Sequence, residues 1–510
     1  MRFMELVRRA RLYFGCTGEY ALPVLRDDSV PLRDSAVWRG VLLARRAAAG
    51  GDEVGASALL RQLVGDGAPE QTDDEAMMVA RIDAGVLDWW RGDVAAAREH
   101  FAEAVESCDP TSGVLLERAR LNLACCRPDG RADAEALRAG PLAGDATVAV
   151  AVFHGREGRL GESLRTLGAL GRPTPLATLN EAVVRGEAGD HEGALARFRT
   201  ALEGLSPGPD HHRAITLLGW GNTGTLAAAG LTGAARDAAF TEAERHLVAA
   251  AELLRAWNGP HRLVADCLRN MGVLHLIRAA DQGDREQLSL ALGNHWAALE
   301  HYHRAPEAAP GRIGDQWRNL ALCHDLLARL SPADAVRAAR RASDCRAEAV
   351  DTLVRVHDVG ALAEADLTEA ALVLDRSPDA AVRLAVPAAL FRAAQRFGFS
   401  GVDARTDWAE AEASHAVDLA LRAAERAGEV DVASALVVTL RFGGVTDWGA
   451  TSGGASAAWD ASTQAAPPRI AGVSDALLPY IEAAASRYGI DQARLIDSVT
   501  IDLMVSDRDR

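Results

Sequence analysis

The sequence is notable first for what it lacks. It contains no lysine, so all 55 basic residues are arginine and no modification of a lysine ε-amine is possible. Aromatic residues make up only 5% of the chain, whereas alanine, leucine, arginine and glycine are abundant. This composition favours helices and is poor material for a β-rich core. No stretch approaches the roughly 18 apolar residues of a membrane span, so we expect neither a membrane helix nor a signal peptide.

The few cysteines and the charge balance exclude further classes. The seven cysteines are scattered and form no C-x-x-C pair, which argues against structural zinc. Cys125 and Cys126 are adjacent, a poor geometry for a disulfide, and we expect them to be buried thiols. The pattern predicts a reduced, cytoplasmic protein. A formal net charge of -16 repels phosphate, so we expect no nucleic-acid partner.

Two segments repeat the same residues at the same spacing. The first contains Gly92-Asp93, Ala97, Phe101, Ala104 and Pro110, and the second contains Gly189-Asp190, Ala194, Phe198, Ala201 and Pro207. Glycine suits a tight turn between two helices, and alanine lets the second helix approach the first closely. Proline ends the unit because it cannot continue a helix. The repeat predicts stacked helical hairpins.

A second repeat, an asparagine followed by an apolar or polar residue and a small residue, lies in the helices that should precede these turns. The copies are Asn122-Leu123-Ala124, Asn180-Glu181-Ala182, Asn222-Thr223-Gly224, Asn270-Met271-Gly272 and Asn319-Leu320-Ala321, and Asp83-Ala84-Gly85 carries aspartate instead. Bulky residues flank the small one in several copies, as in Trp317, Leu320, Ala321 and His324. Such positions pack the seam between neighbouring helices.

These repeats resemble the tetratricopeptide repeat (TPR) family over about residues 34–343. The resemblance implies an all-α fold, an α-solenoid of TPR-like helix hairpins followed by a helical C-terminal domain. We predict an N-terminal helical segment at 1–33, repeats at 34–343 and a C-terminal helical domain at 344–442. Residues 443–474, rich in Gly, Ser, Ala and Thr, are predicted to be a flexible linker, and 475–510 to form tail helices.

The part after the repeats resembles a second kind of protein. Residues 384–391 (Leu-Ala-Val-Pro-Ala-Ala-Leu-Phe) and the amphipathic stretch 408–426 resemble the helical region of bacterial proteins that join TPR repeats to a caspase-like CHAT protease. The tail, residues 467–489, is similar to part of those proteins as well. The resemblance implies a role beside such a protease in sensing or defence. We find no α/β segment for the protease itself.

Three motifs allow a different interpretation. Gly219-x-Gly221-x-x-Gly224 matches a dinucleotide fingerprint, but it lacks a second strand and an acidic residue about 20 positions later. The pairs Glu300/His303 and Glu412/His415 have the spacing of di-iron ligands, although two such pairs are close to chance. We therefore predict no cofactor, metal or catalytic residue.

The asparagine series is the candidate site. In the resembled family, the first helices of the pairs line a groove, where an asparagine amide can both donate to and accept from the backbone of an extended peptide. Arginines beside two of the asparagines could clamp a carboxylate, and a tryptophan pair could supply an anchor. The alternative is that each asparagine only satisfies a neighbouring carbonyl. The predicted partner-binding residues are Asn180, Asn222, Asn270, Asn319, Arg269, Arg318, Trp89 and Trp90.

The sequence thus predicts a TPR-like scaffold or adaptor that binds a protein or peptide partner in its groove. The resemblance suggests a CHAT-type protease as that partner, regulated by the scaffold or supplied with substrate. The alternative is an all-α enzyme with a metal or cofactor in a helical cavity. A homo-oligomer formed through the tail helices is left open.

Overall fold

A computed structural model describes residues 19–26, 35–49, 52–65, 74–107, 113–157, 159–205, 211–256, 261–304, 310–395, 414–437 and 474–489. Two compact units make up the chain. The repeat unit comprises the described residues of Cys16–Gln316 with Arg329–Ser331, and the C-terminal unit comprises the described residues of Trp317–Ala328 and Pro332–Arg510. Across the described residues all regular structure is helical, which confirms the all-α solenoid prediction.

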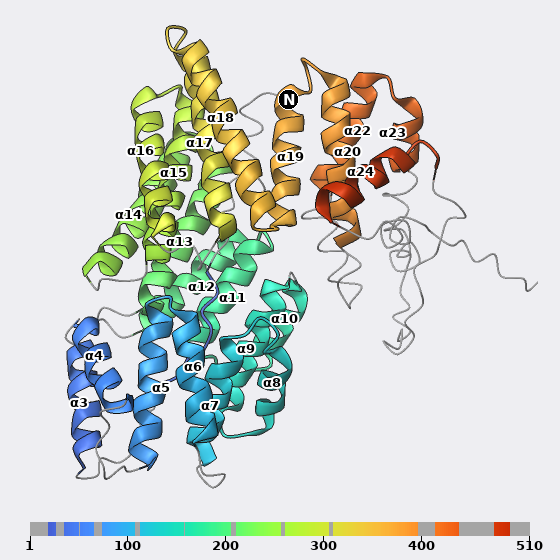
Figure 1. The fold of residues 1–510 in the computed structure, drawn as a ribbon. Helices are drawn as coiled ribbons and strands as arrows, with labels where there is room; N and C mark the ends of the chain where they lie inside the picture. Colours follow the sequence, from blue (N-terminus) through green and yellow to red (C-terminus); the bar gives the residue numbers. More distant parts are fainter. Residues whose placement is uncertain are drawn as a thin grey trace, which may run out of the picture. The chain divides into compact units, whose positions relative to one another are not determined.

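The repeat unit is a succession of helix pairs in which each helix packs on the next one along the chain (Figure 1). We call the first helix of each pair its A helix. The pairs are α3 (Ala36–Ala49) with α4 (Glu53–Val64), α5 (Asp74–Trp90) with α6 (Val94–Glu106), α7 (Gly113–Cys125) with α8 (Arg131–Ala136), α9 (Ala143–Arg156) with α10 (Leu160–Gly168), α11 (Pro175–Glu187) with α12 (His191–Gly204), α13 (His211–Ala229) with α14 (Gly233–Ala256), and α15 (His261–Gln282) with α16 (Arg285–His303). The next helix, α17 (Pro310–Leu330), is counted as an A helix as well; its residues up to Gln316 belong to the repeat unit, and Trp317–Ala328 belong to the C-terminal unit.

The turns form as the glycine repeat predicts. Gly92 and Gly189 have φ values of 86° and 88°, a left-handed conformation that favours glycine. Asp93 and Asp190 then cap the following helices, because each side chain accepts a hydrogen bond from a backbone N–H of the first turn. A side chain larger than hydrogen at either glycine would strain the turn between the two helices.

Small residues on the A helices leave space for aromatic side chains of the neighbouring helices to pack against them. A Cβ atom on Gly85 would lie 2.6 Å from the ring of Phe101, and one on Gly219 would lie 2.7 Å from the ring of Phe198. Both phenylalanines are fully buried. Gly85 is the small position of its repeat copy, so the predicted close approach between helices is confirmed at this seam. Gly219 gives a second close approach, at a position that the repeat does not mark.

The C-terminal unit is also helical. It contains α18 (Ala335–Arg355), α19 (Val359–Val373), α20 (Pro378–Gln395), α22 (Ser414–Ala427), α23 (Val430–Leu436) and α24 (Leu478–Tyr488). Pro387 lies inside α20. Within this unit α24 packs on α19 and α20, and its Arg487 and Tyr488 both donate to the buried carboxylate of Asp366 on α19. The predicted linker up to residue 473 and the second predicted tail helix lie outside the described residues.

One expectation needs correction. The N-terminal segment was expected to be helical, but residues 19–26 form neither helix nor strand. Pro23 lies within them, and the turn around it is closed by a hydrogen bond from the Val24 N–H to the Leu22 carbonyl. The glycine fingerprint at 219–224 lies wholly inside the continuous helix α13, in agreement with its place in the repeated helices. None of the described helices has the length and apolar character needed to cross a membrane.

Candidate peptide-binding groove

Residues 19–26 lie along the A helices of the repeat unit and are largely buried there. We call these eight residues, Glu-Tyr-Ala-Leu-Pro-Val-Leu-Arg, the resident segment. Residues 19–22 and Val24 are each at most 9% exposed. The segment contacts A helices as far apart in sequence as α5 and α17. The row of A helices therefore holds a non-helical stretch of polypeptide, supplied in this structure by the chain itself.

Two asparagines of the repeated series grip the backbone of this segment. The Asn180 Oδ1 accepts the N–H of Ala21 at 2.9 Å, while its Nδ2 donates to the carbonyl of the same residue at 2.8 Å. On α7, the amide of Asn122 does the same for Leu25, with distances of 2.8 Å and 2.9 Å. Each amide satisfies both backbone groups of one residue, which is the recognition that an asparagine side chain can provide to an open backbone.

A carboxylate subsite holds the first residue of the segment. Glu19 accepts hydrogen bonds from Arg262 of α15 and from Arg312 of α17, the latter at 2.6 Å. Burial opposes ionisation of Glu19, but the two guanidinium groups outweigh it and lower the pKa of this carboxyl to about 2. Arg312 also donates to Asp266, which accepts the hydroxyl of buried Tyr302. Glu19 is thus ionised and fixed at neutral pH.

The other end of the segment is cationic. The Arg26 Nε lies 3.4 Å from the Oδ1 of Asp83, the residue that replaces asparagine in the repeated series. Asp83 is fully buried and also accepts from Arg45 at 2.6 Å. The Arg26 guanidinium lies over the ring of Trp90, 5.5 Å from its centroid, and Trp90 in turn stacks on His211. A carboxylate and an aromatic face together make this end a cation site.

The centre of the segment is held by shape and by one more polar contact. The Tyr20 hydroxyl donates to Glu187 at the end of α11. Its ring lies against Gly155 of α9, where a Cβ would come within 2.6 Å of it. Glycine at this position therefore leaves the space that an aromatic ring occupies. Pro23 needs no partner for a backbone N–H, and its carbonyl faces the Cys125 thiol at 3.9 Å.

The predicted site residues separate into those at the segment and those away from it. Asn180 and Trp90 contact the resident segment, whereas Trp89 is half-buried. Asn222 and Asn270 are buried on α13 and α15. The Oδ1 of Asn270 has no hydrogen-bond partner among the described residues. Asn319 is fully buried and belongs to the C-terminal unit.

The two predicted arginine clamps are interior residues. Arg269 is 1% exposed, and its guanidinium lies 3.9 Å from Asp266. Arg318 is 4% exposed and donates to the carbonyl of Ala361 within the C-terminal unit. The carboxylate is instead held by Arg262 and Arg312, which the sequence analysis did not select. Their signal was the recurring arginine two or three positions into an A helix, seen at 213, 262 and 312.

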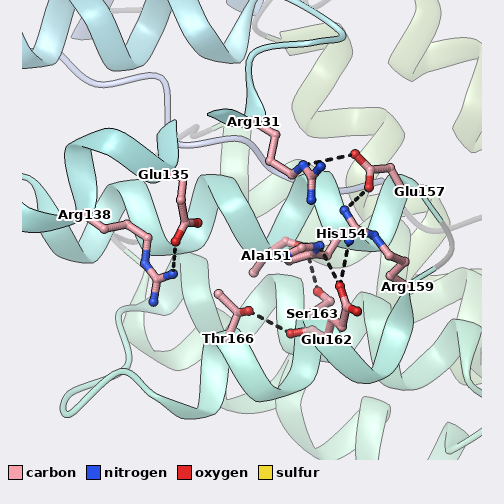
Figure 2. Close-up of polar contacts among 10 residues, drawn as sticks. All are labelled: Arg131, Glu135, Arg138, Ala151, His154, Glu157, Arg159, Glu162, Ser163 and Thr166. Atoms are coloured by element: carbon pink, nitrogen blue, oxygen red, sulfur yellow. Dashed lines mark hydrogen bonds and ion pairs between the residues drawn. The ribbon is translucent and has the colours of Figure 1, made fainter. Parts of the chain in front are cut away.

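Other groups with catalytic potential have structural roles. In the α8–α10 region, His154 lies 3.3 Å from Glu162, and Ser163 is the next residue (Figure 2). However, the Ser163 hydroxyl is buried and donates to the Ala151 carbonyl, not to the imidazole. Burial, aided by Arg159, lowers the pKa of His154. The arrangement joins two helices and provides no activated nucleophile.

The described cysteines are buried, and no disulfide links them. Burial raises the pKa of Cys126 to about 12 and raises that of Cys125 further, so neither forms a thiolate at neutral pH. Across the ranges that the structure describes, no three His, Cys, Asp or Glu side chains gather as metal ligands would. His303 ends α16, and Glu412 of the other predicted pair lies outside those ranges.

Comparisons with known proteins add little. No protein-family model matches the sequence, and no curated protein matches it. Among solved structures, a monomeric mutant of IFIT1 with Gppp-AAAA is similar at a TM-score of 0.34 and 13% sequence identity. The match covers 83% of this chain and 94% of that chain. A similarity at this level does not distinguish one function from another.

Proposed function

We propose that this all-α chain is a TPR-like scaffold that binds a non-helical segment of a partner protein along the A helices of its repeat unit. The observation that carries the proposal is the paired hydrogen bonding of Asn122 and Asn180 to single residues of the resident segment. These four bonds involve only backbone atoms of the bound stretch. Another polypeptide with the same backbone conformation would make all four.

The bound stretch has the properties expected of a ligand. It is short and non-helical, and hydrogen bonds from side chains of separate A helices hold it. Main-chain bonds supply affinity in peptide recognition, and pockets for individual side chains supply selectivity. Here the ring space at Gly155 and the two charged ends are such pockets.

The test uses the full-length chain with its own segment released. Ala21→Pro and Leu25→Pro remove the two N–H groups that the asparagines accept, without changing any helix. A fluorescent peptide with the sequence of residues 19–26 should then bind this variant, as measured by anisotropy. Adding Asn122→Ala and Asn180→Ala should abolish binding while circular dichroism stays helical. A folded released variant that binds no peptide would refute the proposal.

As the identity of the partner we propose a CHAT-type protease encoded elsewhere, which the scaffold would restrain or supply with substrate in a sensing or defence pathway. The support is the resemblance of residues 384–391, 408–426 and 467–489 to proteins that combine both parts. Purification of the tagged chain from its host, followed by mass spectrometry, tests this. Recovery of partners that all lack a caspase-like domain would remove the protease from the proposal.

A non-catalytic, cytoplasmic scaffold is also part of the proposal. It rests on the inert cysteines and on the structural role of the His154 cluster. The alternative from another class, an all-α enzyme, predicts a metal or cofactor that stays with the purified protein. Stoichiometric iron, zinc or a nucleotide found by mass spectrometry would favour the enzyme.

A further inference from the structure

The two charged ends of the groove differ in how much they depend on the segment. At the carboxylate subsite, three guanidinium groups surround two carboxylates: Arg262, Arg269 and Arg312 lie beside Asp266 and Glu19. Without Glu19, Arg262 and Arg312 share Asp266 as their carboxylate partner. Arg262 and Arg312 are then reachable from solvent, because their side chains are already 24% and 21% exposed. This end retains a surplus of positive charge.

At the cation site at the other end, the charge of Asp83 remains paired when the segment is absent. Asp83 keeps its ion pair with Arg45 when Arg26 leaves, since both belong to A helices. What Arg26 adds is a second ion pair at 3.4 Å and the contact with Trp90. A cation over a partly exposed ring contributes modestly, whereas charged hydrogen bonds in a buried site contribute about two to three times more.

We propose that Arg262 and Arg312 form a specificity subsite that selects partner segments with a carboxylate two residues before the residue held by Asn180. The inference rests on the proposed function and deepens it. The partner is a non-helical segment whose acidic residue takes the place of Glu19, with a cationic residue seven positions later as a secondary preference. The resident segment competes with this partner, because a tethered ligand has a millimolar effective concentration. Wild-type chain therefore binds the partner segment more weakly than the released variant does.

The experiment compares peptides on the full-length released variant (Ala21→Pro with Leu25→Pro), to which Glu19→Gln is added. The probe is the labelled peptide of residues 19–26. Replacing its first residue by glutamine should weaken binding about 10- to 100-fold, since hydrogen bonds to a charged group are lost. Replacing its last residue by glutamine should weaken binding only about three- to fivefold. On the chain, Arg262→Gln should remove the preference for glutamate, and the exposed control Arg245→Gln should not.

The outcomes separate the two proposals. Equal affinity for the glutamate and glutamine peptides overturns the subsite and leaves the scaffold function standing. No binding of either peptide to the folded variant overturns both. Dimers in light scattering that exclude the peptide would show a second copy of this chain as the occupant, and that result also overturns the partner assignment.

If the released variant does not fold, a second measurement on the otherwise native chain tests the same subsite. In the otherwise native chain, Glu19→Gln and Arg262→Gln are made singly and together, and cleavage of the Tyr20–Ala21 bond by chymotrypsin is followed. Each single change should speed cleavage about tenfold or more, and the pair should add little beyond either one. Independent, additive effects would overturn the subsite.

Discussion

Replacement of Asn180 by alanine should release the resident segment while the repeat unit stays folded. Asn180 is 1% exposed, and its amide supplies both bonds to the backbone of Ala21, which is itself 3% exposed. Alanine leaves that N–H and that carbonyl buried without these partners. Each such group costs about 1–3 kcal/mol. Because water can enter the vacated space, we take the lower end and expect docking of the segment to weaken by about 2–3 kcal/mol.

Chymotrypsin offers a direct readout, since the Tyr20–Ala21 bond is a substrate only when the segment is undocked. Where opening and closing are fast relative to cleavage, the rate follows the population of the open state. A loss of about 2 kcal/mol corresponds to a rate roughly 30-fold higher. Mass spectrometry can follow this bond separately from all others.

The matched control is Asn270→Ala, a buried asparagine of the same repeated series on α15. It removes an amide of the same size, yet no hydrogen bond joins Asn270 to the resident segment among the described residues. Cleavage at Tyr20 should stay within about threefold of the wild-type rate. Equal cleavage of the Asn180 variant and wild type, or equal acceleration in both variants, would show that the segment is not held by the Asn180 amide.

Three further predictions follow from the same contacts. The folded-state pKa of Glu19 is lowered from 4.5 to about 2, so docking of the segment should be complete above pH 4.5 and weaken by about 3 kcal/mol in total as the pH falls towards 2. Tyrosine fluorescence measured against pH would show this loss of docking, and a flat profile would contradict the prediction. Arg269→Glu should lower the melting temperature sharply, because it replaces a buried cation by another carboxylate beside Asp266; an unchanged melting curve would refute the interior placement. Gly85→Ala should destabilise by about 1–3 kcal/mol in urea, whereas Gly293→Ala, with open space around it, should stabilise by about 0.5–1 kcal/mol; the same sign for both would contradict the seam packing.

Local rules recover the helices and turns from the sequence. Positions 92 and 189 need a left-handed conformation, and the following aspartates cap a helix; both facts depend only on neighbours in the chain. The small residue at 85 and the phenylalanine at 101 belong to one hairpin, so their spacing predicts their contact. For this reason the helical hairpins can be predicted from the sequence alone.

The candidate site depends on contacts between distant residues, and these are predicted only in part. The asparagine series correctly directs attention to amides that grip a backbone, and Asn180 does so. Nothing local reveals that the bound backbone is residues 19–26, because Glu19 meets Arg262 and Arg312 across more than 240 positions. The same periodicity places Arg269 and Arg318 beside asparagines, yet helix rotation turns both into the interior. The spacing of the repeats predicts where along its helix a residue lies. It does not predict which side of that helix the neighbouring helix pair buries.

Hydrogen exchange of the intact chain, resolved to single amides by mass spectrometric fragmentation, tests the central claim most directly. The account predicts that the N–H groups of Ala21 and Leu25, which no helix or strand protects, exchange at least about 100-fold more slowly than in a free peptide, because the side chains of Asn180 and Asn122 accept them. Exchange of both amides at the free-peptide rate would mean that the A helices do not hold a polypeptide backbone, and the scaffold account would fail with it.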